Sequence, residues 1–397
     1  MSQQPHSIDE LQDIVSRLPS TRNEDWKYTD LASARDISSR WLAAGRESLS
    51  LALQDEVEAI THAIDANWIV IANGELQYPV DVNGASRLDD APSSDTALAE
   101  LNAALLKDGL RLRVEDALDK PIGILMIDGT EDASVSQAYV EIDFAAGASG
   151  EIIEYHASKG DADQYANTIV SVAVGDAASA RHLRVQNRAA RHVQTGRTSV
   201  SIGRDASYTM SGFDLGGGLI RNDIIIDIAA AGAEVSFDGL YLAGEGQHID
   251  NHTRVDHRVG PATSRQEYRG ILNGHCRCVW NGKAIVHEGA DGTDADQANH
   301  NLLLSEKAEI DAKPELEIYT DDVKCSHGTT VGQLDEAALF YLRSRGLDKR
   351  HATQVLTHAF AADLVARMPV EAARNALANV VERRLAELLD SDPDTFS

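Results

Sequence analysis

The amino-acid sequence predicts a mainly β protein, with a β-solenoid core between an N-terminal and a C-terminal α-helical domain. Three observations lead to this fold class. Glycines recur at a nearly fixed interval in the middle of the chain, β-branched stretches precede them, and apolar residues at helical spacing occupy both ends. We expect the mostly helical N-terminal domain to span residues 1–121, the core 122–322 and the C-terminal helical domain 323–397.

The repeat in the middle of the chain is marked by six glycines spaced 28 or 29 residues apart. They are Gly147, Gly175, Gly203, Gly232, Gly260 and Gly289. Similar stretches such as NTIVSVAVG and NDIIIDIAAAG lead up to them. A fixed period of this size is typical of arrays in which each unit buries its apolar face on its neighbours. The strand-type composition favours a β-solenoid over helical repeats, with an antiparallel meander of regular hairpins as the alternative.

The N-terminal region contains two helix patterns and one hairpin pattern. SIDELQDIVSRL places apolar residues at helical spacing and is followed by Pro19, which ends the helix. NWIVIANGELQYPV reads as a hairpin whose tight turn is Asn73-Gly74. ALAELNAALLKDG reads as a short helix. This part of the chain is therefore expected to be mostly helical, with one small β element.

The C-terminal region predicts three helices. Asp335 is a good N-cap for the first helix and Gly346 can end it, while Asp348 can begin the second and Pro369 precedes the third. The apolar side of the second helix is expected to contain Val355, Leu356, Ala359 and Phe360. These helices lie beyond the end of the predicted solenoid, where they can cap it or offer a docking surface.

The net charge of −27, from 36 basic and 63 acidic residues, is the strongest compositional feature. It argues against nucleic-acid binding, since phosphates attract basic patches, and against binding to anionic membrane surfaces. No apolar run reaches the roughly 18 residues of a membrane span. The polar start, MSQQPHSIDELQD, lacks the basic and then apolar order of a signal peptide. With three cysteines, too few for a disulfide framework, these features predict a cytoplasmic protein.

Common catalytic and nucleotide-binding motifs are absent from the sequence. The run GGGL at 216–219 lacks the Gly-Lys-Ser/Thr that completes a P-loop, and neither GxSxG nor HExxH occurs. We therefore expect no catalytic residues, no nucleotide bound by this chain and no enzymatic activity.

Two groups of side chains in the core could bind a metal by their spacing. Cys276, Cys278 and Trp280 alternate along one strand, where buried cysteines acting as small apolar residues are the alternative to a metal site. His248 and Asp250 share a strand face with His252, an arrangement suited to a divalent ion. A solvated polar ladder is the alternative for this second group.

Cys325 and His327, in the sequence DDVKCSHGTT, stand two residues apart after the strand-like LEIYTDDV. Residues i and i+2 of an extended chain point the same way, so both side chains can face one ion. Thiolate and imidazole both suit iron, but a cluster generally needs four protein ligands. The missing ligands would come from a partner. At this point a ligand role and a structural role at the junction of solenoid and helices both remain open.

Four segments resemble the SufB/SufD family of iron–sulfur cluster assembly proteins. The most specific is KPELEIYTDDVKCSHGTTVGQLDEAALFYLRSRG, and the others are NEDWKYTDL, SRQEYRGILNG and GTDADQANHNLLLSEKAEID. Together with the flanking sequence the resemblance covers residues 23 to about 360. The modest length, the DWKYTDL block and the Cys-Ser-His-Gly sequence resemble SufD more than SufB. SufB is typically longer and has glutamate beside the equivalent of His327, where this chain has Gly328.

The resemblance implies a right-handed parallel β-helix flanked by N-terminal and C-terminal α-helical domains, in agreement with the repeat. It implies a scaffold subunit of the SUF complex that pairs with a SufB-like paralogue and docks a SufC-like ABC ATPase on helices near residues 335–365. It also allows a homodimer when the chain is isolated. The cargo would be iron or a nascent iron–sulfur cluster, held transiently and shared with SufB, with His327 and Cys325 as metal and cofactor ligands. The alternatives are a purely structural partner without iron ligands, and an acidic β-solenoid enzyme acting on polysaccharide.

Overall fold

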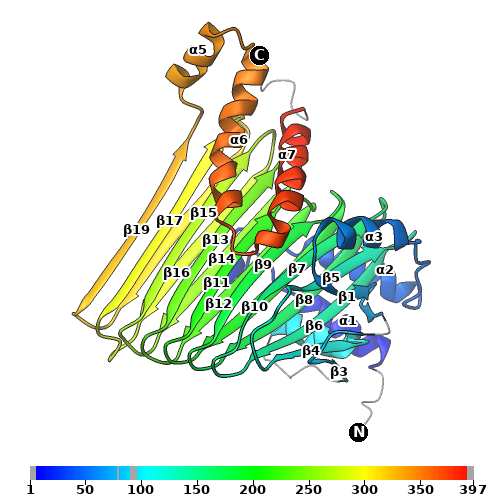
Figure 1. Cartoon of the computed structure of the whole chain (residues 1–397). Coiled ribbons are helices and arrows are strands. Elements are labelled where there is room, and N and C mark those ends of the chain that lie inside the picture. Colours follow the sequence, from blue (N-terminus) through cyan, green and yellow to red (C-terminus); the bar gives the residue numbers. More distant parts are fainter. Residues whose placement is uncertain (1–5, 78–79, 90–95, 391–397) are drawn as a thin grey trace.

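The computed structural model of the chain describes residues 6–77, 80–89 and 96–390. Within these residues the protein is mainly β, and its strands form two long sheets that face each other as a parallel β-solenoid (Figure 1). The ten-stranded sheet has the order β19-β17-β15-β13-β11-β9-β7-β5-β1-β2, and the nine-stranded sheet has the order β18-β16-β14-β12-β10-β8-β6-β4-β3. Successive strands alternate between the two sheets through most of the chain, so two strands and their turns make one coil.

The strand bounds of the two sheets show how evenly the coils follow one another. The ten-stranded sheet contains β1 (Asn67–Ala72), β2 (Glu75–Leu76), β5 (Ile122–Gly129), β7 (Ser149–Lys159), β9 (Ser179–Asn187), β11 (Ser207–Asp214), β13 (Glu234–Ala243), β15 (Thr263–Leu272), β17 (Thr293–Leu303) and β19 (Val323–Gly332). The nine-stranded sheet contains β3 (Ala85–Leu88), β4 (Gly109–Val114), β6 (Ser134–Phe144), β8 (Gln164–Val174), β10 (His192–Ile202), β12 (Leu219–Ile228), β14 (His248–His257), β16 (Arg277–Val286) and β18 (Glu309–Ile318).

Strand register confirms the predicted repeat. β8 and β10 pair in parallel with Gln164 opposite His192, a shift of 28 residues that matches the glycine interval. The glycines meet two different needs at the coil ends. Gly289 has a φ of +86°, which side chains disfavour, whereas a Cβ on Gly175 would lie 2.8 Å from the carbonyl oxygen of Phe144 in the coil below. Because the neighbouring strands of the core are parallel, the alternative of an antiparallel meander is wrong.

Paired strands lie on both sides of the predicted core limits of 122 and 322. β1 pairs in parallel with β5, and β4 pairs in parallel with β6, so the stack of coils begins within the region expected to be mostly helical. At the other end, β19 pairs in parallel with β17 over its whole length. The solenoid therefore includes residues that sequence reasoning assigned to the flanking domains.

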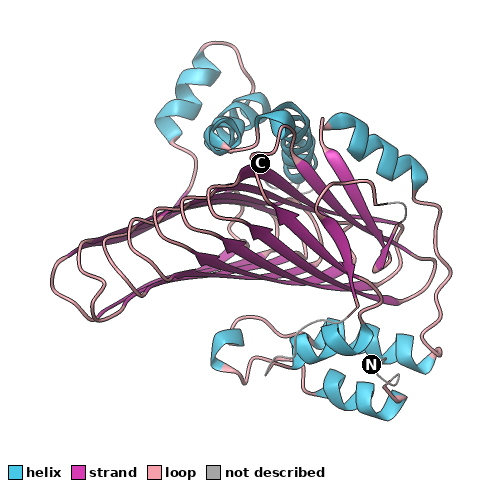
Figure 2. Ribbon diagram, turned by 60° about the horizontal axis from the view of Figure 1, so that its bottom comes forward, coloured by secondary structure: helices cyan, strands magenta, loops and turns pink. Residues whose placement is uncertain are grey.

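Helices cover both faces of the solenoid, and α3 lies on the same face as α6 and α7 (Figure 2). The N-terminal elements are α1 (Ile8–Ser16), η1 (Glu24–Trp26), α2 (Ala32–Ala43), α3 (Gln54–Ala63) and α4 (Ala97–Leu105). The C-terminal elements are α5 (Glu336–Ser344), α6 (Lys349–Arg367), η2 (Glu371–Ala373) and α7 (Arg374–Asp390). α2 and α4 contact β6 and β8 of the nine-stranded sheet, whereas α6 and α7 contact β13 of the ten-stranded sheet.

Local sequence signals determine where several of these elements begin and turn. The Ser7 hydroxyl accepts a hydrogen bond from the Glu10 amide, and the Glu10 carboxylate accepts one from the Ser7 amide, which makes a capping box for α1. The predicted hairpin is confirmed, since β1 and β2 are antiparallel around Asn73-Gly74, which have φ values of 50° and 76°. Asp335 caps α5 by accepting from the Ala337 amide at 2.8 Å, as predicted.

The predicted apolar side of α6 is not the side that the helix buries. Val355 is 47% exposed and Ala359 is also exposed, while Leu356 and Phe360 are only half-buried. The buried residues of α6 are Ala352, Thr353, Thr357, Ala361, Leu364 and Val365. The helix directs this side, which includes Leu364 and Val365, toward the ten-stranded sheet and α7.

The lumen between the two sheets has an apolar part and a polar part. The apolar part is a continuous aliphatic and aromatic cluster that includes Ile224, Ile226, Val255 and Trp280, all at most 2% exposed. The polar part consists of lumen-facing side chains that bond to one another across coils. Asn222, for example, donates to the Asn251 side chain at 2.9 Å on the neighbouring strand. Buried polar groups of this kind hold the coils in one register because a shift would leave them without partners.

Candidate functional site

Cys325 and His327 lie inside strand β19, and not after the last strand as sequence reasoning placed them. LEIYTDDV begins in β18, continues through the turn that follows and ends with Val323, the first residue of β19. This strand then runs through the Cys-Ser-His-Gly sequence to Gly332. The junction with the C-terminal helices comes only after this strand. The candidate pair therefore belongs to the terminal coil of the solenoid.

The side chains of Cys325 and His327 share the lumen side of β19. Cys325 pairs in register with Ala295 and His327 with Gln297, and both of these β17 residues are buried in the lumen. Gln297 in turn pairs with Gln266 of β15, so His327 continues a polar ladder of the lumen. β19 is the last strand of its sheet, and here the ladder reaches the open end of the stack. His327 is therefore exposed and Cys325 half-buried, although both are lumen-facing.

The surroundings of Cys325 favour the protonated thiol. Burial raises the pKa of the Cys325 thiol, and the Asp294 carboxylate on β17 acts in the same direction, against a hydrogen bond from the Ala295 backbone. Iron is bound by the thiolate, so ligation at this sulfur must release a proton. The two side chains can supply one sulfur and one nitrogen donor, which is half of the usual ligand number of a cluster.

Cys278 of β16, and Cys276 just before this strand, belong to the apolar lumen. Cys278 and Trp280 are fully buried and Cys276 is 3% exposed, within the same cluster as the aliphatic residues of neighbouring coils. Burial raises the pKa of the Cys278 thiol well above its usual value, and Cys276 beside it adds to this shift. Of the two alternatives for this pair, the structure supports small apolar core residues.

His248, Asp250 and His252 do share one face of β14, but protein groups already satisfy them. The Asp250 carboxylate accepts hydrogen bonds from Arg221 at 2.6 Å and from the Thr29 hydroxyl, which also lies 2.7 Å from His248 Nε2. His252 Nε2 is 3.2 Å from the other Asp250 oxygen. In the described part of the chain, no group of three or more His, Cys, Asp or Glu side chains has metal-binding geometry. Asp250 and His248 instead hold the N-terminal segment that contains Thr29 against the sheet.

The lumen contains a buried cluster of one carboxylate and two imidazoles that the sequence did not predict. Glu154 lies 2.5 Å from His156 Nε2 and 3.2 Å from His182 Nε2, and all three are at most 3% exposed. Burial opposes the ionisation of Glu154, but the hydrogen bonds to the two histidines outweigh it and lower the pKa of its carboxyl. Glu154 and His156 are separated by one residue on β7, and a strand pattern gives no sign that His182 of β9 joins them. Only the register of the coils reveals this cluster.

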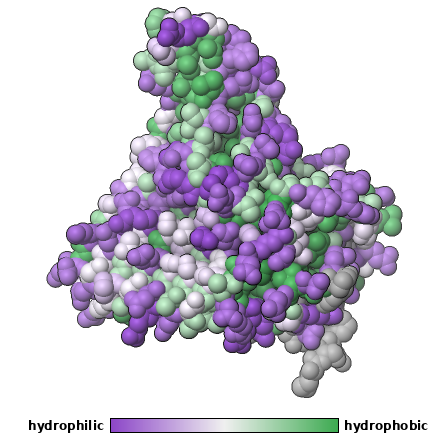
Figure 3. Space-filling view, viewed as in Figure 1, coloured by the Kyte–Doolittle hydropathy of each residue, from purple (hydrophilic) through white to green (hydrophobic). Residues whose placement is uncertain are grey.

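The C-terminal helices carry an apolar surface that nothing covers in the described part of the chain. Phe340 and Tyr341 on α5 are 74% and 58% exposed, and Val355 on α6 is also exposed. None of the α5 residues is buried. The hydrophobic surface of this projection is visible at the top of the space-filling view (Figure 3). It follows the C-terminal end of β19, whereas Cys325 and His327 lie in the first half of that strand (Figure 1).

Comparison with known proteins identifies the family. Residues 126–360 match the family model described as SUF system FeS cluster assembly, SufBD core domain. The chain belongs to the SufBD family. The matched range contains β19 with both candidate ligands, as well as α5 and most of α6.

Three relatives show that the similarity extends over nearly the whole chain. The iron–sulfur cluster assembly protein SufD of Escherichia coli is 30% identical over 400 residues, covering 96% of this chain and 93% of that protein. An iron–sulfur cluster assembly SufBD family protein of Synechocystis is 28% identical, with 93% and 88% covered. SufD of Bacillus subtilis is 26% identical, with 96% and 84% covered. Within the SufBD family the chain is thus SufD-like, as the sequence motifs indicated.

None of the helices in the described ranges combines the length with the apolar character required for crossing a bilayer.

Proposed function

We propose that this SufBD-family chain is a scaffold subunit of an iron–sulfur cluster assembly complex, and that His327 and Cys325 are part of the ligand set for its cargo. The observation that carries the proposal is the position of the two side chains. They face the lumen side of a terminal strand but remain accessible, because no further coil within the described residues stacks on β19. The cargo is iron or a nascent cluster, held transiently.

A SufB-like paralogue is the partner that we infer for this end of the solenoid. β19 and β18 each end a sheet, so the outer edge of each has unpaired backbone donors and acceptors. A second β-solenoid that pairs with these edges would extend both sheets and enclose the lumen ladder that ends at His327. It could then add the ligands that a two-donor site lacks. The same edges permit a homodimer of the isolated chain.

A SufC-like ATPase is the partner that we infer for the C-terminal helices. The uncovered apolar side chains of α5 and α6 lie in the 335–365 region to which the family resemblance assigns docking. Nucleotide hydrolysis would then be the task of that subunit, and we infer that this chain itself has no catalytic role. The names of the relatives concern iron–sulfur assembly and give no support to the polysaccharide-enzyme alternative.

The test compares His327→Ala with wild type in the complex with its SufB-like and SufC-like partners. Alanine has no donor atom, so iron and acid-labile sulfide per complex should fall at least severalfold after anaerobic reconstitution, while subunit association is retained. His62→Ala on the exposed face of α3 is the matched control for loss of a histidine and should leave iron and sulfide unchanged. Cys325→Ala should have a smaller effect than His327→Ala, because the partner is expected to supply the main thiolates.

Undiminished iron and sulfide in the His327→Ala complex would exclude the ligand role and leave the purely structural alternative. Loss of subunit association with the same variant would instead show that the residue acts in pairing. The isolated chain should retain little iron in either form, since two donors do not complete a site.

A further inference from the structure

The register of β19, the strand with both candidate iron ligands, is not fixed by buried side chains. Every residue of β19 is exposed or half-buried, so the strand lacks the apolar packing that fixes register in the interior of the solenoid. It also contains Gly328 and Gly332, which weaken strand pairing, and a Cβ at either position would meet nothing in the described part of the chain within 4 Å. A slip of one residue would turn Cys325 and His327 from the lumen to the outer side.

Two hydrogen bonds between side chains join the outer side of β19 to β17. The Ser326 hydroxyl donates to the Asp296 carboxylate, and the Thr330 hydroxyl lies 2.8 Å from His300 Nδ1. In each pair the two residues are direct register partners, so a slip of the strand would break both bonds. Ser326 directly precedes His327 and Thr330 follows it three residues later, which places one bond on each side of the proposed ligand.

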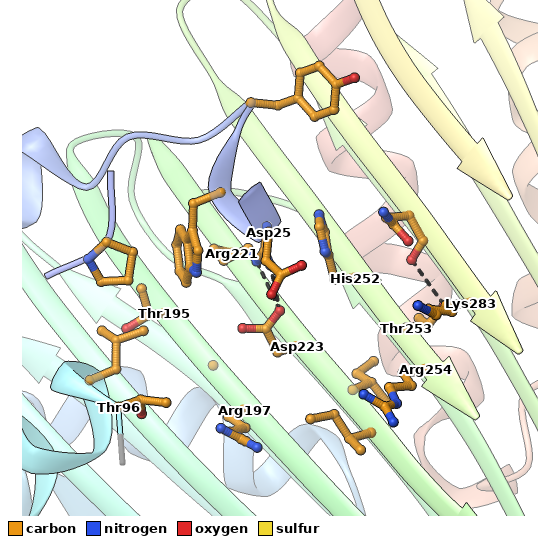
Figure 4. A pocket seen from close by; sticks show the side chains of 18 of the residues that line it. Asp25, Thr96, Thr195, Arg197, Arg221, Asp223, His252, Thr253, Arg254 and Lys283 are labelled. Atoms are coloured by element: carbon orange, nitrogen blue, oxygen red, sulfur yellow. Dashed lines mark hydrogen bonds and ion pairs between the residues drawn. The ribbon is translucent and has the colours of Figure 1, made fainter. Parts of the chain in front are cut away.

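Several outer-face ion pairs of the interior coils have a different geometry. On β12, Arg221 pairs at 2.7 Å with Asp223, two residues along the same strand (Figure 4). Arg254 and Asp256 pair in the same way on β14. A pair within one strand moves with that strand and does not fix its register. The interior strands do not depend on such pairs, because their buried lumen residues already fix the register.

We propose that Asp296 and His300 are positioning residues for the proposed iron site. By binding Ser326 and Thr330, they hold β19 in the register that directs both candidate ligands to the lumen. They do not touch the iron themselves, because they alternate with the buried lumen residues of β17 and lie on its outer side. Each bond is a modest cross-strand interaction, but a terminal strand opens at a low free energy, so two such bonds matter there. The inference rests on the proposed function for the iron alone, since the register of β19 is measurable without a metal.

The first experiment uses the isolated full chain without iron. The double variant Asp296→Ala, His300→Ala removes both partners on β17 and leaves the sequence of β19 unaltered. We expect the amide protons of residues 323–332 to exchange severalfold faster than in wild type. Iodoacetamide should also alkylate Cys325 severalfold faster, since its half-buried sulfur becomes accessible when the strand slips or detaches. The other two cysteines are buried and serve as internal references in the same peptide map.

Two controls separate positioning from a general loss of stability. The double variant Asp296→Asn, His300→Asn keeps an oxygen acceptor for Ser326 and places an amide near the position of Nδ1, so it should restore slow exchange and slow alkylation. Ser179→Ala removes the same kind of bond from an interior coil, where Ser179 accepts from its register partner Ser207 at 2.8 Å. This variant should leave the exchange of β19 and the alkylation of its cysteine as in wild type.

The second experiment measures iron and acid-labile sulfide in the complex with the SufB-like and SufC-like partners. The double alanine variant should contain severalfold less of both after anaerobic reconstitution, and the double asparagine variant should recover them. Unchanged exchange and alkylation in the double alanine variant, or failure of the asparagine rescue, would overturn the role in register. Faster exchange with undiminished iron would overturn the positioning role. Iron retained by the His327→Ala complex would instead overturn the proposed function, while the exchange data still decide the role of Asp296 and His300 in register.

Discussion

Individual buried histidines make the stability of this protein sensitive to acid. His192 and His257 are both fully buried, and burial lowers the pKa of each to about 4. Arg188 adds to the shift of His192, whereas Asp256 opposes that of His257. Below about pH 6.5 the unfolded chain takes up a proton at each histidine, but the folded chain does not until about pH 4. Their contribution to stability is therefore present at neutral pH and is lost as the pH falls through this window.

We predict that His257→Gln flattens the pH dependence of unfolding between pH 6.5 and 4. One such histidine accounts for at most about 3 kcal/mol of lost stability across the window. The measurement is the free energy of unfolding in urea at several pH values, with both proteins compared above pH 7 to correct for any change in packing. Asp238 acts in the opposite sense, since burial raises its pKa to about 6, but it is present in both proteins and cancels in the comparison. Parallel curves for wild type and variant would contradict the prediction.

At the scale of elements, the short segment around η1 is the anchor of the N-terminal helices. Trp26 packs against the guanidinium of Arg221 at 4.4 Å from its ring, and Tyr28 lies under Arg277. Thr29 is 1% exposed, and its hydroxyl bonds to Asp250 and His248 of β14. The DWKYTDL motif thus has a structural explanation: its side chains attach a helical segment to the outer surface of the solenoid.

Thr29→Val should lower the free energy of unfolding by about 1–3 kcal/mol, because it leaves a buried carboxylate short of one donor at nearly constant side-chain volume. Urea denaturation measures the loss, and limited proteolysis should show earlier cleavage within residues 6–45. Thr21→Val, on an exposed position of the same segment, is the matched control and should remain within about 0.5 kcal/mol of wild type. Equal stability of the two variants would show that the anchor does not depend on this hydroxyl.

The elements also show which parts of the fold were predictable from the sequence and which were not. Period, hairpin and helix caps were predictable because each depends on residues close in the chain, such as Asn73-Gly74 or the Asp335 cap. The buried side of α6 was not predictable, because its partners are α7 and a strand far away in the sequence. The more apolar side with Val355 is exposed. For the candidate site, the shared face of Cys325 and His327 followed from their spacing. Their place in the terminal coil, and the Glu154–His182 contact, depended on register between coils.

For the whole molecule, α6 and α7 are part of the folded core and not an appendage. Together with the outer side of the ten-stranded sheet they form an apolar cluster, in which Leu240 and Ile271 meet Leu364, Leu377 and Leu385. A deletion of residues 330–397 would expose this cluster and shorten β19, so it could not separate ATPase docking from folding. α5, which buries none of its residues, can be altered without this penalty.

We predict that the double variant Phe340→Ser, Tyr341→Ser keeps its stability within about 0.5 kcal/mol of wild type but loses co-elution with the ATPase subunit. Leu385→Ala, which truncates a residue of the buried cluster, should lower stability by about 2–5 kcal/mol. Thermal unfolding and size-exclusion chromatography of the mixed subunits measure both effects. Retained co-elution of the double variant would place the docking surface elsewhere.

The open end of the solenoid has a consequence for the dynamics of the proposed site. Each coil of a stacked array is stabilised by its neighbours, and the strand at the end has a neighbour on one side only. β19 pairs with β17 alone and is mostly exposed, so its local opening should require less free energy than that of any interior coil, and its amide protons should exchange early. In the complex that we propose, we expect the partner to stabilise this strand when it covers it. Pairing of the subunits and assembly of the proposed ligand set would then be one thermodynamic event.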